Sequence, residues 1–505
     1  MTTIFPPLTP ARGLRTYLTC LLIGASLVGL VFDGKTASAQ SLEEAMAAAY
    51  AVNPGLKAER SRYEATNQGV WTARSEFLPT VTGTYFGGHN TYRNERSTND
   101  RTYSHDLGLS LSQTLFQGLA GVNRLNQAHE EAASGRNQLI GAEQALLFNT
   151  ADAYLQVVRD RAILAHLKAY TRVVSREANA ARARYRSGDA TRTDIEQALA
   201  RLAEAQGNSE QAAGDLEASI ALYERLTGQK PAKLGWPGIP KSIEPADLND
   251  AILIAYQNNP SIRAATADAR AARFAARASV GDMLPRVTLE SDWDHGYRGN
   301  LANQDEDEFT LGVRVTAPLF TGGRNIAAVK RAKFTAAQQE YELDDTQQII
   351  RENVIRAMKQ RTASRSRAKA QKRAIEANHR AVKGLQIEFN GGQRSLLDVL
   401  DGERELLLSQ VDYVRARYDA RIADFLLLAN IGRLAPQHFS IIEERPSPVA
   451  RVLPEFNTWD LRLAPTENDT VQLEVASGKT PKMATGSLSS AAAINWGNWP
   501  YRTGG

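Results

Sequence analysis

The feature that most constrains this chain is a helical hairpin tip that occurs twice, 204 residues apart. The first copy is YRSGDATRTDI, from Tyr185 to Ile195, and the second is FNGGQRSLLDVLD, from Phe389 to Asp401. When the two are aligned, Gly188 meets Gly392. Glycine tolerates the left-handed backbone in which many helices end. Each copy is therefore predicted to be a turn between two antiparallel helices.

A new helix is expected to start a few residues after each of these glycines. Thr193 and Glu196 have the spacing of a capping box, in which each side chain bonds the backbone of the other. The second tip carries three charged residues, Arg394, Asp398 and Asp401.

The whole chain is a tandem repeat with a period of about 205 residues. LEEAMAAAYAVNP, from Leu42 to Pro54, returns as LNDAILIAYQNNP, from Leu248 to Pro260. FLPTV returns as MLPRV, and LFQG returns as LFTGG. Because these landmarks recur in the same order, we expect two copies of one repeat and not the number of separate domains that the length alone suggests.

Each repeat is predicted to contain a helix, two strands and a long helical hairpin. The expected divisions are a signal peptide (1–39), repeat 1 (40–230, strands within 77–116, tip near 188), a Pro- and Gly-rich linker (231–247), repeat 2 (248–434, strands within 285–320, tip near 392) and an irregular, largely disordered tail (435–505).

The first residues have the pattern of a cleaved export signal. Arg12 and Arg15 precede an apolar run from Leu18 to Phe32, and residues 37–39 are small. An uncleaved membrane anchor is the alternative, which the short, Gly-interrupted run disfavours. The only cysteine, Cys20, lies in this segment, so the mature chain is expected to lack disulfides and cysteine metal ligands.

Residues 106–116 and their counterparts in the second repeat alternate between apolar and polar side chains, which is typical of strands with one non-aqueous face. The apolar positions include Leu107, Leu109, Leu111, Leu289, Trp293, Phe309, Leu311, Val313 and Val315. Strands of about ten residues with this pattern are typical of membrane barrels. A small sheet on a soluble core is the alternative. Charged residues between the apolar ones, Glu290, Asp292 and Arg314, favour a water-filled lumen. Four strands cannot close a barrel, so this interpretation requires several copies.

Two stretches without proline are predicted to form very long helices. Residues 118–186 would form a helix of about 100 Å at a rise of 1.5 Å per residue. Ile140, Leu147 and Tyr154 recur every seven residues, followed by Val157 and Leu164. This spacing predicts coiled-coil packing against neighbouring helices.

The sequence offers little for catalysis or for cofactor binding. The seven histidines lack metal-ligand spacing, and a net charge of +4 is too small to indicate nucleic-acid binding. ASGKT, at 476–480, lacks the first glycine of a phosphate loop. DEDE, at 305–308, is interpreted as a solvated loop, with a cation site as the alternative. The basic run 361–383 is interpreted as a solvated helix face, with partner docking as the alternative. Neither an enzyme, a cofactor nor a metal is expected.

Taken together, the signal peptide, the duplicated strand pair with its long hairpin, the NP near each repeat start and the LFxGG motif resemble the TolC family of outer-membrane efflux and secretion channels. The resemblance covers Ser41 to Arg433, and GQRSLLDVLD is its most specific motif. It implies a mostly helical protomer with a β-barrel segment. Three protomers would form a twelve-stranded outer-membrane barrel that continues as a long periplasmic α-helical barrel.

The resemblance also implies partners and a cellular location. The chain would be a homotrimer in outer-membrane lipid of a Gram-negative bacterium. It would act as an exit duct for small molecules or type I-secreted proteins, opened by a periplasmic adaptor and an inner-membrane ABC or RND-type pump. A periplasmic coiled-coil adaptor or scaffold is the alternative, and an exported hydrolase is a weaker one.

The functional positions of the family fall on the two tips. The resemblance places a periplasmic gate at Thr193, Asp194, Phe389 and Arg394, with Phe389 standing where the family has tyrosine. It places a cation-selective constriction at Asp398 and Asp401. Asp194 and Asp398 also have a second interpretation, because acidic side chains favour helix N-termini through the helix dipole.

Overall fold

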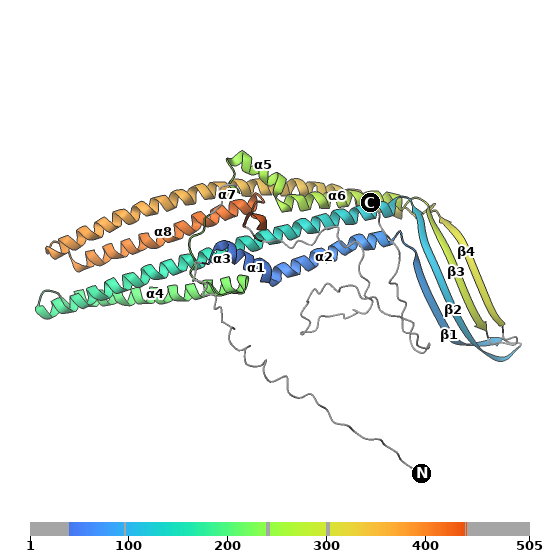
Figure 1. Ribbon diagram of the computed structural model, residues 1–505, viewed down its shortest axis with the longest axis horizontal. Helices are drawn as coiled ribbons and strands as arrows, with labels where there is room; N and C mark the ends of the chain where they lie inside the picture. Colours follow the sequence, from blue (N-terminus) through green and yellow to red (C-terminus); the bar gives the residue numbers. More distant parts are fainter. Residues whose placement is uncertain (1–39, 95–96, 239–242, 299–303, 440, 442–505) are drawn as a thin grey trace, which may run out of the picture. The chain divides into compact units, whose positions relative to one another are not determined.

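The computed structural model describes residues 40–94, 97–238, 243–298, 304–439 and 441. These residues belong to one compact unit, Met1–Glu443. The expected signal peptide and residues 442–505 of the expected tail lie outside the described residues. Within this unit, long helices lead into a sheet of four strands (Figure 1).

The first helical segment is divided at Asn53, where the Asn-Pro pair predicts an interruption. α1 (Leu42–Val52) begins after Ser41, which forms a capping box with the third helical residue. Asn53 ends α1 and caps α2 (Pro54–Ser75). Proline is tolerated at this first helical position, because its missing N–H would have no partner within the helix.

The second repeat starts in the same way, 206 residues later. α5 (Leu248–Asn258) is followed by Asn259, which caps α6 (Pro260–Gly281). The side-chain oxygen of Asn259 accepts a hydrogen bond from the Ser261 N–H (2.9 Å).

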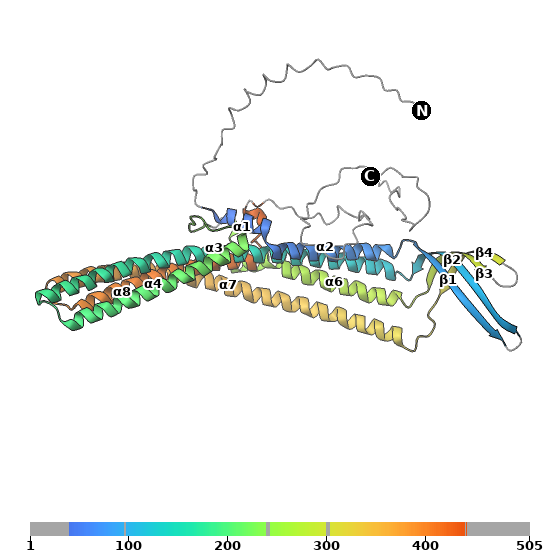
Figure 2. The same cartoon turned by 90° about the horizontal axis from the view of Figure 1, so that it is seen from below.

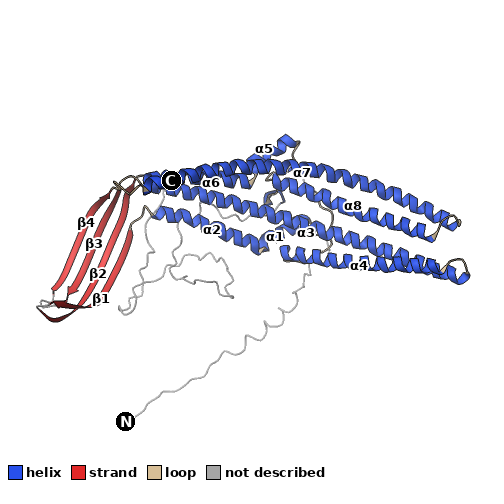
Figure 3. Cartoon of the chain, turned by 180° about the vertical axis from the view of Figure 1, so that it is seen from behind, coloured by secondary structure: helices blue, strands red, loops and turns tan. Residues whose placement is uncertain are grey.

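Two strands from each repeat form one antiparallel sheet. They are β1 (Thr80–Asn94), β2 (Ser97–Gln117), β3 (Arg286–Arg298) and β4 (Gln304–Thr316). The order is β1-β2-β3-β4, so the two repeats meet between β2 and β3 while β1 and β4 are the edges (Figure 3). The strands have 13 to 21 residues rather than about ten, because pairing continues outward past the apolar segments.

The register places the apolar residues of the four strands on one face, called here the apolar sheet face. Trp293 lies opposite Leu109 on one side and Phe309 on the other. Directly opposite residues project to the same face of a sheet. Exposed members of the apolar sheet face include Val81, Leu107, Leu109, Leu311, Val313 and Val315.

The opposite face of the sheet is polar, as the alternation predicts. Arg314 on β4 contacts Glu290 on β3, with 2.7 Å between Nε and Oε2. Thr288 and Asp292 lie on the same side, two residues from Glu290 along β3.

Four long helices form the two hairpins: α3 (Ala120–Ser187), α4 (Arg192–Thr227), α7 (Arg324–Asn390) and α8 (Leu396–Asn430). α3 has 68 residues and α7 has 67, which at 1.5 Å per residue is about 100 Å each. Figure 2 shows the hairpins running away from the strands. Among the described residues, no helix has both the length and the apolar character needed to span a bilayer.

The seam expected on α3 is buried. Leu147 and Val157 are fully buried and Tyr154 is nearly so, whereas Ile140 and Leu164 are half-buried. The Tyr154 hydroxyl donates a hydrogen bond to the carbonyl of Gln40 (2.9 Å), which ties the start of the described chain to the core.

The start of the expected tail is ordered, in contrast to the prediction of an irregular segment from 435. Pro436–Phe439 form a single turn of 3₁₀ helix, η2. Phe439 and Ile441 are buried in the main core. One turn is too short to leave a periodic pattern in the sequence, and so sequence analysis missed it.

An arginine fastens the helix–strand junctions of the two repeats to each other. Arg124 on α3 contacts the Glu76 carboxylate at the end of α2 (3.2 Å) and that of Asp282 at the end of α6 (2.6 Å). Glu76 and Asp282 are equivalent positions of the repeat, whereas the counterpart of Arg124 in the second repeat is Ala328.

A buried ion-pair network joins α7, α8 and the segment between the repeats. Nε of Arg361 lies 2.9 Å from Oδ1 of Asp424, and Arg365 contacts the same oxygen at 2.7 Å. Arg361 also bonds Glu244. Arg361 was expected on a solvated face but is only 9% exposed, because α8 and the linker cover it.

Removing the carboxylate of Asp424 is expected to destabilise the protein strongly. Breaking one partner of a buried pair leaves an uncompensated charge, which costs about 3–5 kcal/mol. Asp424→Asn should therefore lower the free energy of unfolding by several times more than Asp419→Asn, whose carboxylate is more exposed and lies 3.5 Å from Arg367. Urea unfolding followed by circular dichroism at 222 nm measures both. Equal effects would contradict a buried, uncompensated arginine.

Candidate functional site

The first hairpin tip is a short turn between α3 and α4. Gly188 follows α3 in the left-handed conformation (φ 91°), and its N–H bonds the last carbonyls of the helix. α4 starts after Thr191, whose hydroxyl accepts from the Asp194 N–H (3.2 Å), while the Asp194 carboxylate accepts from the Thr191 N–H (2.8 Å). The capping box is thus Thr191 with Asp194, not Thr193 with Glu196.

The helix begins two residues earlier than predicted because the turn after Gly188 needs only three residues. Thr193 therefore lies inside the first turn of α4 and is exposed. Glu196 is also exposed and is 4.0 Å from Arg192.

The second tip repeats this geometry. Gly392 is left-handed (φ 75°) and follows the last residue of α7 by two positions. Ser395 caps α8, and the Asp398 carboxylate accepts hydrogen bonds from its N–H (3.0 Å) and hydroxyl (2.8 Å). These bonds, followed by the nearby Arg394, lower the pKa of Asp398 below its ordinary value.

Asp194, expected in the gate, and Asp398, expected at the constriction, are therefore both the acidic partners of capping boxes in the single chain. Arg394 contacts Glu388, with 2.9 Å between Nε and Oε2, rather than Asp194. The hydrogen bond to Glu388 is the main reason why the pKa of Arg394 is raised.

Asp401 is paired across the two hairpins. Its carboxylate lies 2.9 Å from the Arg201 guanidinium on α4. Arg201 also contacts Glu204 (3.2 Å), which lies 3.9 Å from Arg404 on α8. The second hairpin is therefore linked to the first by ionic contacts near the tips.

The aromatic ring of Phe389 makes a contact with a cation on the other hairpin. The Arg184 guanidinium carbon lies 4.6 Å from the centre of the Phe389 ring. A cation over an aromatic face is attracted by the ring quadrupole. Beneath this contact a small apolar cluster fills the space between the hairpins, and it includes Val174, Ala198, Leu396 and Leu400.

Sequence analysis missed Arg184, Arg201, Thr191 and Ser395. The two caps had a signal, because Thr191 and Ser395 are both followed by aspartate at the third position. The two arginines had none, because their partners lie on another hairpin. Within the described part of the chain, no group of three His, Cys, Asp or Glu side chains is placed to hold a metal ion.

The fold is that of solved outer-membrane channels. It is similar to the Campylobacter jejuni CmeC outer membrane channel, with a TM-score of 0.70 at 14% identity, covering 80% of this chain and 90% of that one. It is also similar to the open state of the Neisseria gonorrhoeae MtrE outer membrane channel, with a TM-score of 0.67 at 19% identity, covering 79% and 90%.

The sequence places the chain within this class. Residues 46–229 and 252–433 match the model of the outer membrane efflux protein family. The chain belongs to this family, whose members are efflux and secretion channels of the outer membrane. The two matched segments lie within the two predicted repeats, 40–230 and 248–434.

Curated relatives share most of the chain. The outer membrane efflux protein BepC of Brucella suis is 29% identical over 418 residues, which covers 82% of this chain and 90% of the relative. The outer membrane protein TolC of Escherichia coli is 24% identical over 451 residues, covering 86% and 90%. The alkaline protease secretion protein AprF of Pseudomonas aeruginosa is 25% identical over 381 residues, covering 73% and 79%.

Loss of the second capping box is expected to loosen the first turn of α8. Because the folded-state pKa of Asp398 is lowered, the box stabilises the tip above the ordinary aspartate pKa and is lost as the pH falls through the lowered value. Asp398→Asn should raise amide exchange in residues 396–401 at neutral pH, measured by mass spectrometry. Asp412→Asn, in the middle of α8, is the matched control and should leave that segment unchanged.

Proposed function

We propose that three copies of this chain close into one outer-membrane duct. The observation that carries this proposal is the four-stranded sheet, whose two edge strands have no partner strand on their outer side and whose apolar face is exposed. Unpaired edges and exposed apolar faces are normally covered. In a closed ring of twelve strands, neighbouring copies would pair the edges, lipid would cover the apolar sheet face, and the polar face would line water.

The hairpins extend this duct into the periplasm. α3 and α7 each lead away from the sheet for about 100 Å. Side by side in three copies, they would enclose a tunnel whose far end is formed by the tips. Cargo would leave through this tunnel, either small molecules, as the name of BepC suggests, or secreted proteins, as the name of AprF suggests.

We propose that an inner-membrane ABC or RND-type pump drives transport through this duct by way of a periplasmic adaptor. The tips lie at the end of the hairpins away from the sheet and are the natural docking end. Their weak, exposed ionic contacts suit a switch that a docking partner can open. A periplasmic scaffold would explain the hairpins but would leave the apolar sheet face in water.

Purification tests this function directly. The mature chain should fractionate with outer membranes, require detergent, run as a trimer by light scattering and give ion-conducting channels in planar bilayers. A monomer that is soluble without detergent would contradict the duct.

We assign the gate to the two tips. Asp194, Thr193, Phe389 and Arg394 would form it, with Asp194 of one copy meeting Arg394 of another once the copies assemble. Arg184 holds Phe389, and so it would connect the gate to α3. Exposed ion pairs are individually weak, and it is their threefold repetition that would keep the gate shut.

Removing the gate charges is expected to open the duct. Asp194→Ala combined with Arg394→Ala should raise the single-channel conductance in planar bilayers, because the links between copies are lost. Asp189→Ala, in the turn that precedes α4, is the control and should leave the conductance unchanged. Unaltered conductance of the double variant would place the gate elsewhere.

Rings of Asp398 and Asp401 would select cations at the constriction. Carboxylates that lie close together repel one another, and their combined negative charge attracts multivalent cations strongly. Trivalent hexamminecobalt should therefore block the channel, and Asp398→Ala with Asp401→Ala should abolish the block.

Arg201→Ala offers the converse test, because Arg201 partly neutralises Asp401. This variant should lower the blocking concentration of hexamminecobalt several-fold. Block that persists without both aspartates would move the constriction to other residues.

A further inference from the structure

Gln40, which directly follows the small residues 37–39 of the expected cleavage site, is tied to a distant part of the chain. Its main-chain N–H donates a hydrogen bond to the carbonyl of Lys233 (3.0 Å), and its own carbonyl accepts one from the Tyr154 hydroxyl (2.9 Å). Gln40 and Leu234 form an isolated parallel β-bridge. The first residue of the expected mature chain is therefore anchored to the segment between the two repeats.

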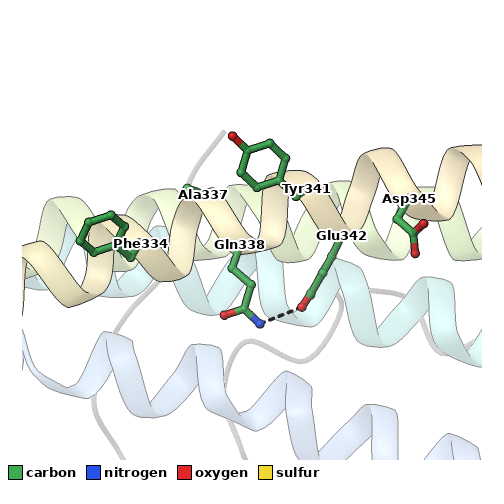
Figure 4. Close-up of a pocket in the computed structure, with 6 residues that line it drawn as sticks. All are labelled: Phe334, Ala337, Gln338, Tyr341, Glu342 and Asp345. Atoms are coloured by element: carbon green, nitrogen blue, oxygen red, sulfur yellow. Dashed lines mark hydrogen bonds between the residues drawn. The ribbon is translucent and has the colours of Figure 1, made fainter.

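The side-chain amide of Gln40 takes part in the same contact. A glutamine on a long helix can bond its own helix, as Gln338 does on α7, where it donates to Glu342 (2.8 Å; Figure 4). Oε1 of Gln40 instead accepts a hydrogen bond from the N–H of Ala232 (3.3 Å), 192 residues away. Nε2 of Gln40 has no hydrogen-bond partner among the residues that the structure describes.

The segment that receives Gln40 is itself held by α3. Arg161 donates hydrogen bonds to the carbonyls of Pro231 (3.0 Å) and Ala232 (2.6 Å). The Tyr154 hydroxyl, which donates to Gln40, also accepts from the N–H of Gly235 (3.1 Å). Tyr154, Arg161 and residues 231–235 are called here the Gln40 clamp. Because α3 positions both of its side chains, the clamp belongs to the core of the protein.

The equivalent positions of the second repeat lack these groups. At the offset of 206, Gln40 corresponds to Ala246, whose N–H donates to the Asp250 carboxylate (2.9 Å). At the offset of 204, Tyr154 corresponds to Met358, which has no hydroxyl. Position 246 lies in the middle of the chain, whereas position 40 would be a chain end after cleavage. The clamp is therefore found at the repeat that would begin with a free end.

Cleavage after Ala39 would give Gln40 an α-amino group, which at neutral pH is mostly protonated and positively charged. The Arg161 guanidinium binds the same segment, so a second positive charge there would be repelled. The carboxylate of Glu44, which is close in the chain, already accepts a hydrogen bond from the Ser41 N–H (3.2 Å) in the capping box of α1. An uncharged chain end would fit this clamp better than a charged one.

We propose that the exported chain begins at Gln40, that this residue is converted to pyroglutamate, and that the Gln40 clamp holds the product. In this reaction the uncharged α-amino nitrogen attacks Cδ of its own side-chain amide. A bond forms between that nitrogen and Cδ, and the bond between Cδ and Nε2 breaks. One proton passes from the α-amino group to Nε2, which leaves as ammonia. The step consumes no oxidant, reductant or other reactant.

The product keeps the two groups that the clamp binds. The lactam ring has one N–H, from the former α-amino group, and one carbonyl, whose oxygen is the former Oε1 of Gln40. These are the donor to Lys233 and the acceptor from Ala232. The hydrogen bond from Tyr154 goes to the main-chain carbonyl, which the reaction leaves unchanged. Cyclisation thus removes only the positive charge and the nitrogen without a partner.

A held lactam would also protect the start of α1. α1 begins two residues after Gln40, and Leu42 and Met46 belong to the main core. Aminopeptidases require a free α-amino group, which pyroglutamate does not have. The modification would therefore keep the anchored end of the chain from being shortened.

Peptide mass spectrometry tests the modification. The full chain is expressed with its own first 39 residues, purified from membranes in detergent and digested with trypsin. Peptide 40–57 should have the mass of its glutamine form less one ammonia. An isotope-labelled synthetic peptide of the same sequence with a free Gln40, added before digestion, measures cyclisation during handling and should stay mostly uncyclised. Gln40→Ala should give the same peptide with a free α-amino group.

Pyroglutamyl aminopeptidase, which removes this residue from exposed chain ends, tests the clamp. It should act on the folded chain at least tenfold more slowly than on the isolated peptide 40–57. Tyr154→Phe leaves residue 40 unchanged and should speed removal from the folded chain several-fold, because one side of the clamp is lost. Tyr170→Phe is the matched control, since it removes a hydroxyl from α3 in the apolar cluster near the tips, and it should leave the rate unchanged.

Three results would overturn the inference. They are a mature chain that starts at another residue, a Gln40 that keeps its free α-amino group, and equal removal of pyroglutamate from the folded chain and from the peptide. If Tyr154→Phe does not fold, as circular dichroism would show, the comparison of the unmodified folded chain with the peptide decides alone. The proposed duct is tested separately by its trimer and its conductance, so it stands or falls independently of these results.

Discussion

The fold depends on one constraint: an open four-stranded sheet cannot provide hydrogen-bond partners for the backbone groups on the outer sides of its two edge strands. Every strand except β1 and β4 has a partner on both sides, and those two leave a row of backbone N–H and C=O groups unpaired. Such groups are costly where water is absent. The apolar sheet face adds a second demand, because it needs a non-aqueous neighbour. α2 leads into the edge strand β1 and α7 follows the edge strand β4, so these two helices lie next to the unpaired edges.

Stability is distributed unevenly along the helices, and the difference has a physical cause. Near the middle, Arg361 and Asp424 are buried and bonded to each other, so the arrangement there is costly to disturb. At the tips, the pairs of Arg201 with Asp401 and of Arg394 with Glu388 are exposed, and water screens them. The proposed duct would need this difference if it opens at the tips while its middle stays closed.

Much of the fold could be predicted from the sequence. The features that could not be predicted are contacts between segments that lie far apart in the chain. Local patterns were sufficient for the strand faces, for the break at Asn53 and for the glycine turns, because each depends on neighbouring residues. The contacts of Arg201, Arg184 and Arg361 join segments far apart in the chain, and no local pattern records them. The capping boxes were recoverable but misplaced by two residues at the first tip, since Thr191 and Thr193 both have the right chemistry. Whether the tip residues form a gate stays a prediction.

The two ion pairs of Arg124 have a consequence for how a ring of three copies would flex. Within one chain, a single guanidinium bridges the equivalent carboxylates Glu76 and Asp282 and so links the ends of α2 and α6, where each helix leads into a strand. The matching position in the second repeat is Ala328, whose short, uncharged side chain cannot form such ion pairs. Around a closed ring of three copies, pairs of junctions linked by Arg124 would thus alternate with pairs that have no such link. Movement at the helix–strand junctions would therefore be easiest at the three boundaries between neighbouring copies.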